Sequence, residues 1–252
     1  MKVLLYIAFI GTNYCGYQIQ PNGITVQQRL NEAAKSLFGY DCDIVGCSRT
    51  DSGVHANCFC ATVSKKGSNS LETTVPVGKI PVAMSNLLPG DIAVYDAKEV
   101  EDSFHARYDV KYKEYVYKIW NRAERDPFSA DRSYHYPRRI DDNALEKMND
   151  AARRFIGAHD FTAYMKADTD VASTVRTVVD ARVTRMGDMI EFRVSADGFL
   201  YNMVRIFVGT LLAVAEGKIA PEDIDDITLS RDRKRAGITA PPHGLFLNKV
   251  IY

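Results

Sequence analysis

KVLLYIAF, residues Lys2 to Phe9, sets the fold class of this chain. Its residues are apolar and rich in β-formers, which predicts a buried strand. A secretory signal peptide is the alternative, because a single lysine precedes the apolar run. No small-residue cleavage site follows, however, and Thr12-Asn13-Tyr14 has the composition of a turn. We therefore expect an opening strand in a cytoplasmic protein.

The residues that follow this strand predict two helices and three further strands. Apolar residues recur at helical spacing after Val26, and a Pro89-Gly90 pair ends a shorter helical stretch. The expected elements are a helix at Val26–Phe38, strands at Cys42–Cys47 and Cys58–Val63, a helix at Val82–Leu88 and a strand at Ile92–Ala97. With the opening strand, their order is β-α-β-β-α-β.

The second half of the chain repeats this order without sequence identity to the first. The expected elements are a strand at Tyr112–Trp120, a helix at Asp141–Ile156, strands at Val175–Thr184 and Met189–Val194, a helix at Tyr201–Ala215 and a strand at Gly244–Ile251. We predict an α+β protein of two tandem ferredoxin-like units, residues 1–104 and 105–252. They would share a mostly antiparallel sheet, with helices on one face and the active-site cleft between the units.

Composition excludes several classes of protein. With 32 basic and 32 acidic residues the net charge is zero, so the chain is not a generally basic nucleic-acid binder. No apolar run approaches the roughly 20 residues of a membrane span. An odd number of cysteines, five, indicates reduced thiols. The spacing of Cys42, Cys47, Cys58 and Cys60 is not that of a zinc site, so no metal is expected.

Basic residues are unevenly distributed along the chain. Residues 107–125 hold six Lys or Arg against three acids, and RDRKR at Arg231–Arg235 adds four against one. Such runs permit a basic face for a polyanion, although a solvated surface is the commoner explanation.

The helical stretch FLYNMVRIFVGTLLAVAEG, residues 199–217, is apolar nearly all round and contains Arg205. A guanidinium is costly to bury unpaired, so a carboxylate partner is predicted. Alternatively, Arg205 reaches back along Asn202 to solvent or forms a structural ion pair. Asp51 is the candidate partner, because it lies in a loop at the matching topological position.

That loop, CSRTDSGVHA at Cys47–Ala56, interrupts an apolar, strand-like region. Ser52-Gly53 allows a sharp turn, so that Asp51 can project from a strand end. Arg49 would hold a phosphate or fill the space of a displaced base. The alternatives are a polar hairpin tip and a metal ligand, and His55 is expected to be a polar residue at a strand edge.

A further stretch, YKEYVYKIW at Tyr112–Trp120, combines aromatic and basic residues. Alternation places Tyr115, Tyr117 and Lys113 on one strand face and Lys118 on the other. Such a face can stack bases and hold phosphates, or it can pack into a sheet core. The consensus of an RNA-recognition motif is absent.

CSRTDSGVHA resembles the aspartate motif of the TruA-type tRNA pseudouridine synthases. Further stretches resemble this family in the same order along nearly the whole chain. They are LPGDIAV at Leu88–Val94, FHARYDVKYKEYVYKI at Phe104–Ile119, HDFTAY at His159–Tyr164, FLYNMVRIFVGTLL at Phe199–Leu212 and AGITAPPHGLFLNKVIY at Ala236–Tyr252. Ser48 departs from the family motif, which often has glycine there.

The resemblance implies an isomerase that converts uridine to pseudouridine in the anticodon stem-loop of tRNA, around positions 38 to 40, without cofactor or metal. It implies Asp51 as the catalytic aspartate, Arg49 in flipping the base, Tyr115 over the base, and Arg205 as the partner of the aspartate. It also implies a homodimer that shares one tRNA. Whether the carboxylate attacks the sugar or the uracil, or removes a sugar proton, stays open.

Other residues are expected to bind the substrate. Leu245 would form an apolar wall for the base, and phosphate contacts are expected from Arg107, Lys111, Lys113 and Lys118. A non-catalytic RNA-binding protein with an RRM-like sheet would explain the basic, aromatic strand but not Arg205. A ferredoxin-like enzyme for a small molecule would explain the acid and arginine but not the basic run.

Overall fold

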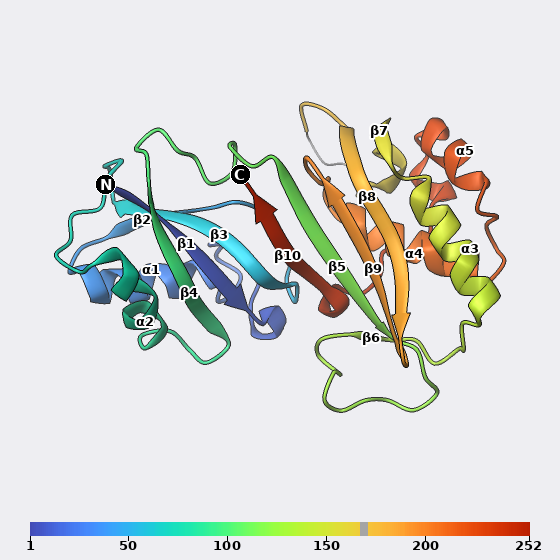
Figure 1. The fold of residues 1–252 in the computed structure, drawn as a ribbon, viewed down its shortest axis with the longest axis horizontal. Coiled ribbons are helices and arrows are strands. Elements are labelled where there is room, and N and C mark those ends of the chain that lie inside the picture. The colour runs from blue at the N-terminus through green and yellow to red at the C-terminus, as the bar shows by residue number, and fades with distance from the viewer. Residues whose placement is uncertain (167–170) are drawn as a thin grey trace. The chain divides into compact units, whose positions relative to one another are not determined.

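The structure, a computed structural model, describes residues 1–166 and 171–252, which form two compact units (Figure 1). Unit 1 contains Met1–Lys111 and Phe246–Tyr252, and unit 2 contains Tyr112–Leu245. This division differs from the expected 1–104 and 105–252 mainly in the final strand. That strand joins unit 1 because Phe246 and Leu247 pair with the start of its third strand.

Unit 1 is a mixed α+β structure built on an antiparallel sheet in the order β4-β1-β3-β2. The final strand, β10, pairs in parallel with β3. Its elements are β1 (Lys2–Phe9), α1 (Val26–Phe38), β2 (Cys42–Gly46), β3 (His55–Lys65), α2 (Ile80–Ser85), β4 (Ile92–Val100) and β10 (Leu245–Ile251), with short 3₁₀ turns at Gly11–Asn13 and Val77–Lys79.

The predicted elements of unit 1 are all present, β1 and α1 with the predicted bounds and the others with changed bounds. In β1, Val3, Leu5 and Ile7 are fully buried, as expected for an opening core strand. The short helix covers residues 80–85 rather than 82–88, because Pro81 lies in its first turn, where a missing N–H costs nothing. β3 is longer than expected and begins at His55, next to the polar loop.

Unit 2 also has an antiparallel sheet, in the order β5-β9-β8-β7, and a short strand β6 that is parallel to β5. Its elements are β5 (Tyr112–Trp120), β6 (Tyr134–His135), α3 (Asp142–Arg153), β7 (Gly157–Asp160), β8 (Val175–Met186), β9 (Met189–Ala196), α4 (Met203–Ala215) and α5 (Asp223–Ser230), with 3₁₀ turns at Thr162–Tyr164, Arg233–Arg235 and Pro242–Gly244. β6, β7 and α5 were not predicted from the sequence, because none of them is long enough to show a clear period of apolar residues.

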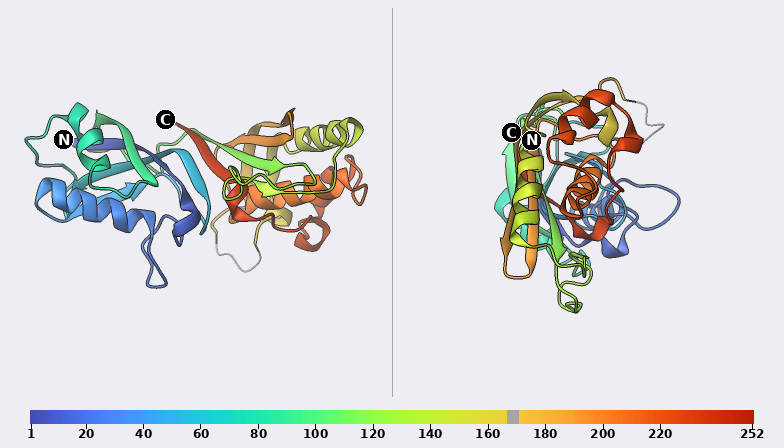
Figure 2. Two further views of the ribbon diagram at one scale, coloured as in Figure 1. Left: turned by 90° about the horizontal axis from the view of Figure 1, so that it is seen from below. Right: turned by 90° about the vertical axis from the view of Figure 1, so that its right-hand side faces the viewer.

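The core of unit 2 lies between its sheet and the helices α3 and α4, which Figure 2 shows from two further directions. Phe207 of α4 stacks on Phe155 at 3.9 Å between ring centroids and also meets Phe192 of β9. Asp141 caps the N-terminus of α3, because its side chain accepts a hydrogen bond from the backbone N–H of Ala144. The aromatic side chains thus fix α4 over one face of the sheet.

α4 begins at Met203 rather than at the predicted Tyr201. The cause is Asn202, whose φ of 63° is left-handed and therefore not helical. The predicted end at Ala215 is confirmed.

The described residues were also searched for membrane spans and metal-ligand clusters. Within them, no helix is long and apolar enough to cross a bilayer. Nor does any group of three or more His, Cys, Asp and Glu side chains in this part of the chain have the placement to hold a metal ion. The five cysteines are free thiols.

Candidate active site

The loop that carries Asp51 connects the antiparallel strands β2 and β3 in unit 1. Gly53 has a φ of 79°, and the backbone N–H of Val54 donates to the carbonyl of Asp51 at 3.2 Å. Asp51 is half-buried and Arg49 is exposed. Asp51 therefore lies in the loop of a hairpin, between the end of β2 at Gly46 and the start of β3 at His55.

A second segment, residues 11–24, supports this loop. The N–H of Tyr17 donates to the Thr50 carbonyl at 3.3 Å, and the Ser52 hydroxyl donates to the Tyr14 carbonyl at 3.1 Å. Gly16, with a φ of 80°, passes so close that a Cβ would lie 2.4 Å from the Thr50 oxygen. The support of the Asp51 loop by this segment was not predicted from the sequence. The glycines of the segment were the available signal.

His55 is a fully buried residue at the start of β3, which corrects the expectation of a polar strand edge. Its Nδ1 accepts a hydrogen bond from the Gly11 N–H at 2.9 Å, and its ring packs on Phe246 at 4.7 Å between centroids. Because Nδ1 accepts, the proton of the neutral ring is on Nε2. His55 therefore ties the start of the 11–24 segment to the base of the Asp51 loop.

Arg205 in unit 2 is half-buried, not fully buried as the apolar helix had indicated. Its Nε donates to the Ala240 carbonyl at 2.7 Å and its Nη1 to the Asn202 side-chain oxygen at 2.9 Å. The contact with Asn202 is the one that the alternative interpretation anticipated. These bonds fix the direction of the guanidinium at the first turn of α4.

Residues 236–244, which we call the strap, run along α4 and include Ala240, whose carbonyl accepts from Arg205. Gly237 packs on Gly209 so closely that a Cβ on Gly237 would lie 2.3 Å from the Gly209 backbone. The Gly237 N–H also donates to the Thr210 hydroxyl at 2.9 Å, and Ala240 N–H donates to the Arg205 carbonyl at 3.0 Å. The helix and the strap therefore form one hydrogen-bonded layer.

Two further side chains hold the strap. Arg233 donates to the Gly237 carbonyl at 2.8 Å and to the Thr239 hydroxyl at 3.2 Å. Tyr117 donates its hydroxyl proton to the Pro241 carbonyl at 2.8 Å. Burial raises the pKa of Tyr117, so that it keeps this proton. Neither role was predicted. The Tyr117 bond spans 124 residues of the chain, and the Arg233 bonds reach only four and six residues ahead but lie in an irregular segment without a period.

Tyr115 and Tyr117 of β5 lie on the helix-covered face of the sheet. Tyr117 is opposite Phe192, which contacts Phe207 of α4, and Tyr117 is fully buried. Tyr115 retains 6% exposure and meets the ring of Phe199 edge-on at 5.0 Å. Of the two interpretations left open for this strand face, packing into a sheet core therefore describes Tyr117.

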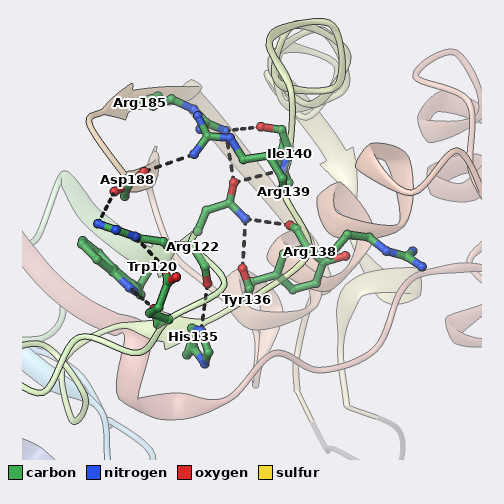
Figure 3. Close-up of polar contacts among 11 residues, drawn as sticks. Trp120, Arg122, His135, Tyr136, Arg138, Arg139, Ile140, Arg185 and Asp188 are labelled. Carbon is green, nitrogen blue, oxygen red and sulfur yellow. Dashed lines mark hydrogen bonds and ion pairs between the residues drawn. The ribbon is translucent and has the colours of Figure 1, made fainter.

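One basic residue of the first run, Arg122, is engaged in structural ion pairs. Arg122 forms ion pairs with Glu124 at 2.8 Å and with Asp188 at 3.6 Å, and Arg139 joins Asp188 at 3.1 Å (Figure 3). The buried Asn121 beside them donates to the carbonyls of residues 136 and 138. This network joins the end of β5 to the β8–β9 turn.

The RDRKR segment is also structural in part. Arg231 forms an ion pair with Asp160 at 2.9 Å, and Arg235 donates to the carbonyl of Asp226 at 3.3 Å. Together with the bonds of Arg233 to the strap, these contacts account for three of its four basic side chains.

The remaining predicted substrate-binding residues are divided between the units. In unit 1, the Arg107 guanidinium lies 5.9 Å from the Tyr108 ring centroid, and Lys111 donates to the Tyr252 carbonyl at 3.2 Å. In unit 2, Lys113 and Lys118 lie on β5, the latter opposite Glu191. Leu245, buried, follows the strap directly. Tyr115, Arg205 and Leu245 thus belong to unit 2, and Asp51 and Arg49 to unit 1.

Comparisons with known proteins found relatives that match this chain along its whole length. A family model described as tRNA pseudouridine synthase matches residues 5–109 and 151–252. The chain is 44% identical over 253 residues to tRNA pseudouridine synthase A of Thermoanaerobacter sp. (strain X514), covering 100% of this chain and 99% of the relative. Identity to tRNA pseudouridine synthase A 2 of Clostridium perfringens (strain 13 / Type A) is 43% over 251 residues, with the same coverage.

A third relative, tRNA pseudouridine synthase A of Bacillus pumilus (strain SAFR-032), is 41% identical over 257 residues, again covering 100% of this chain and 99% of the relative. Among solved structures, a chain of a Cbf5-Nop10-Gar1 complex matches 97% of this chain and 57% of its own length at 12% identity. Its TM-score of 0.35 is too low to support any inference about this protein.

Proposed function

Because this chain belongs to the tRNA pseudouridine synthase family, and is therefore an isomerase, we propose that it converts uridine to pseudouridine in the anticodon stem-loop of tRNA, at positions 38 to 40. The observation that carries this proposal is the full-length similarity to relatives named tRNA pseudouridine synthase A. The resemblance of CSRTDSGVHA to the family's aspartate motif supports Asp51 as the catalytic carboxylate.

The reaction breaks the bond between N1 of uracil and the sugar, rotates the freed base, and joins its carbon 5 to the same sugar carbon. Carbon 5 loses its proton as it bonds to the sugar and the freed N1 gains one, so the atoms balance without oxidant or water and the proposal includes no cofactor. The Asp51 carboxylate starts the reaction at the target nucleoside. Its support on a turn braced by residues 11–24 suits a group that must stay fixed while the base rotates.

The other site residues act around this carboxylate. Arg49, exposed on the same loop, fills the space that the flipped uridine leaves in the RNA. Tyr115 lies over the uracil and takes the carbon-5 proton in the last step, and Leu245 forms an apolar wall for the base. Arg205 pairs with Asp51 and favours its charged form.

For the architecture we propose two tandem ferredoxin-like units that share one sheet, with the active site formed by residues of both. The order β4-β1-β3-β2 in unit 1, with every one of these neighbours antiparallel, supports the first unit. The order β5, α3, β8, β9 and α4 in unit 2, followed along the chain by β10, supports the second. We further propose a homodimer in the cytoplasm that shares one tRNA.

The decisive test is to incubate the protein with unmodified tRNA transcript and map pseudouridine at single-nucleotide resolution. We expect pseudouridine at positions 38 to 40 and at no other uridine of the transcript. Binding without modification would favour the non-catalytic RNA-binding alternative. Neither binding nor modification would favour an enzyme for a small molecule.

Phosphate binding by the basic residues predicts a change in the salt dependence of tRNA binding. Alanine at Lys111 or Lys113 should weaken binding and lower the slope of log Kd against log salt by about one for each phosphate that the variant no longer neutralises. Alanine at Lys118, which lies opposite Glu191, should change the slope less. Filter binding from about 50 to 200 mM salt measures the slopes.

Lys147→Ala on the exposed face of α3 is the matched control, and it should leave the slope unchanged. If the Lys111 and Lys113 variants have the parent slope, these residues do not contact phosphate.

A further inference from the structure

The connection between β9 and α4, residues 197–202, presents an exposed tyrosine, Tyr201, close to Arg205 in the chain. Tyr201 is 44% exposed although it precedes one of the most apolar helices of the protein. The following residue, Asn202, has left-handed backbone geometry and accepts the hydrogen bond from Arg205. A non-glycine residue with left-handed backbone geometry is uncommon and often marks a functional site. The turn therefore exposes Tyr201 while it holds Arg205.

A lysine lies across the face of this tyrosine. The Lys166 ammonium is 5.1 Å from the centroid of the Tyr201 ring, and the Lys166 backbone N–H donates to the Tyr201 carbonyl at 3.1 Å. The backbone bond keeps the two residues together, and Lys166 is itself exposed. An aromatic face with an adjacent positive charge matches the two parts of a nucleotide, its base and its phosphate.

The same connection also reaches Tyr115. Phe199, two residues before Tyr201, meets the Tyr115 ring edge-on at 5.0 Å. One short segment thus carries an aromatic residue against the tyrosine proposed to lie over the target uracil, and a second aromatic residue that faces solvent. A nucleotide on Tyr201 would therefore be a near neighbour of the target in the RNA.

We propose that Tyr201 and Lys166 form a subsite for a nucleotide that flanks the target uridine. The flanking base stacks on the Tyr201 ring, and its phosphate binds the Lys166 ammonium. This inference rests on the proposed function, and it adds a binding role for two residues outside the Asp51 and Arg205 pair. Stacking does not distinguish strongly between bases, so the subsite strengthens binding without reading sequence.

The test uses an anticodon stem-loop RNA with 2-aminopurine in place of the nucleotide on either side of the target. In the parent protein we expect quenching at one of the two positions. Tyr201→Leu, which keeps apolar bulk but has no aromatic face, should lose that quenching and bind roughly tenfold more weakly. Turnover at saturating RNA should stay within about twofold of the parent, because the subsite contributes binding rather than chemistry.

Three other variants separate the contributions. Tyr201→Phe should behave as the parent in both measurements, since the ring is retained. Lys166→Ala should keep the quenching but lower the salt slope by about one. Phe128→Ala, which removes an aromatic residue that is 86% exposed on another loop of unit 2, should change neither.

If Tyr201→Leu shows the quenching and affinity of the parent, the proposed subsite is wrong. It is also wrong if Phe128→Ala loses quenching and affinity to the same extent as Tyr201→Leu. A thermal melt of each variant confirms folding, and Tyr201→Phe against Tyr201→Leu gives the comparison at nearly equal side-chain volume. Quenching and affinity do not require turnover. They therefore decide the subsite even if the parent forms no pseudouridine, a result that would instead overturn the proposed function.

Discussion

Asp51→Asn protein should release tritium from carbon-5-labelled uridine in tRNA at least about 10³-fold more slowly than the parent. Asparagine keeps the shape of the side chain and its place in the turn, but it has no charge with which to start cleavage of the glycosidic bond. Because the backbone bonds from Tyr17 and Val54 to this loop do not involve the Asp51 side chain, the loop should keep its conformation. Affinity for tRNA should stay within about threefold.

Asp43→Asn is the matched control for this experiment. Asp43 is an exposed aspartate on the strand before the loop, and its side chain accepts a hydrogen bond from the Gly67 N–H at 3.0 Å. This variant should release tritium at the parent rate. If Asp51→Asn also does so, the carboxylate is not catalytic.

Loss of charge at Arg205 should reduce turnover far more than it reduces tRNA affinity. We expect Arg205→Gln to lower kcat by roughly 10²-fold, because the charge that favours an ionised Asp51 is removed in the closed site. Arg205→Lys should fall between the parent and Arg205→Gln. It keeps the charge but cannot reproduce the paired donation of Nε to Ala240 and Nη1 to Asn202. Single-turnover kinetics at saturating tRNA, with separate binding curves, measure both quantities.

Arg182→Gln serves as control, since Arg182 is an exposed arginine on β8 that forms an ion pair with Asp180. It should match the parent in both kcat and affinity. Because Arg205 also holds the strap, thermal unfolding of each Arg205 variant must be followed alongside. A large loss of affinity with unchanged kcat would identify Arg205 as a residue that contacts tRNA instead.

The elements of the fold followed largely from local pattern. A continuous apolar run rich in β-formers located β1, and helical spacing located α1 with both of its ends. The failures were at boundaries and in short elements. Helix α4 begins two residues late because of the left-handed Asn202, whose backbone conformation no periodicity records. β6 and β7 are held by pairing with neighbouring strands, so their own residues carry little signal.

The candidate site residues were found from local anomalies. Asp51 and Arg49 stood out as charges in an apolar region, and Arg205 as a charge in an apolar helix. The residues that hold them did not stand out. His55 and Tyr117 act through hydrogen bonds to backbone atoms far along the chain, and Arg233 acts through bonds within an irregular segment. Such bonds leave no mark in the residues on either side of them.

The sequence by itself determined which residues carry charge where the chain is otherwise apolar, and it determined the order of the main strands and helices, because both depend on neighbouring residues. Only the tertiary structure decided that residues 11–24 brace the Asp51 loop and that the Ala240 carbonyl of the strap accepts from Arg205. It also placed β10 beside β3 in unit 1. Each of these depends on backbone groups that find their partners only after distant segments have packed together.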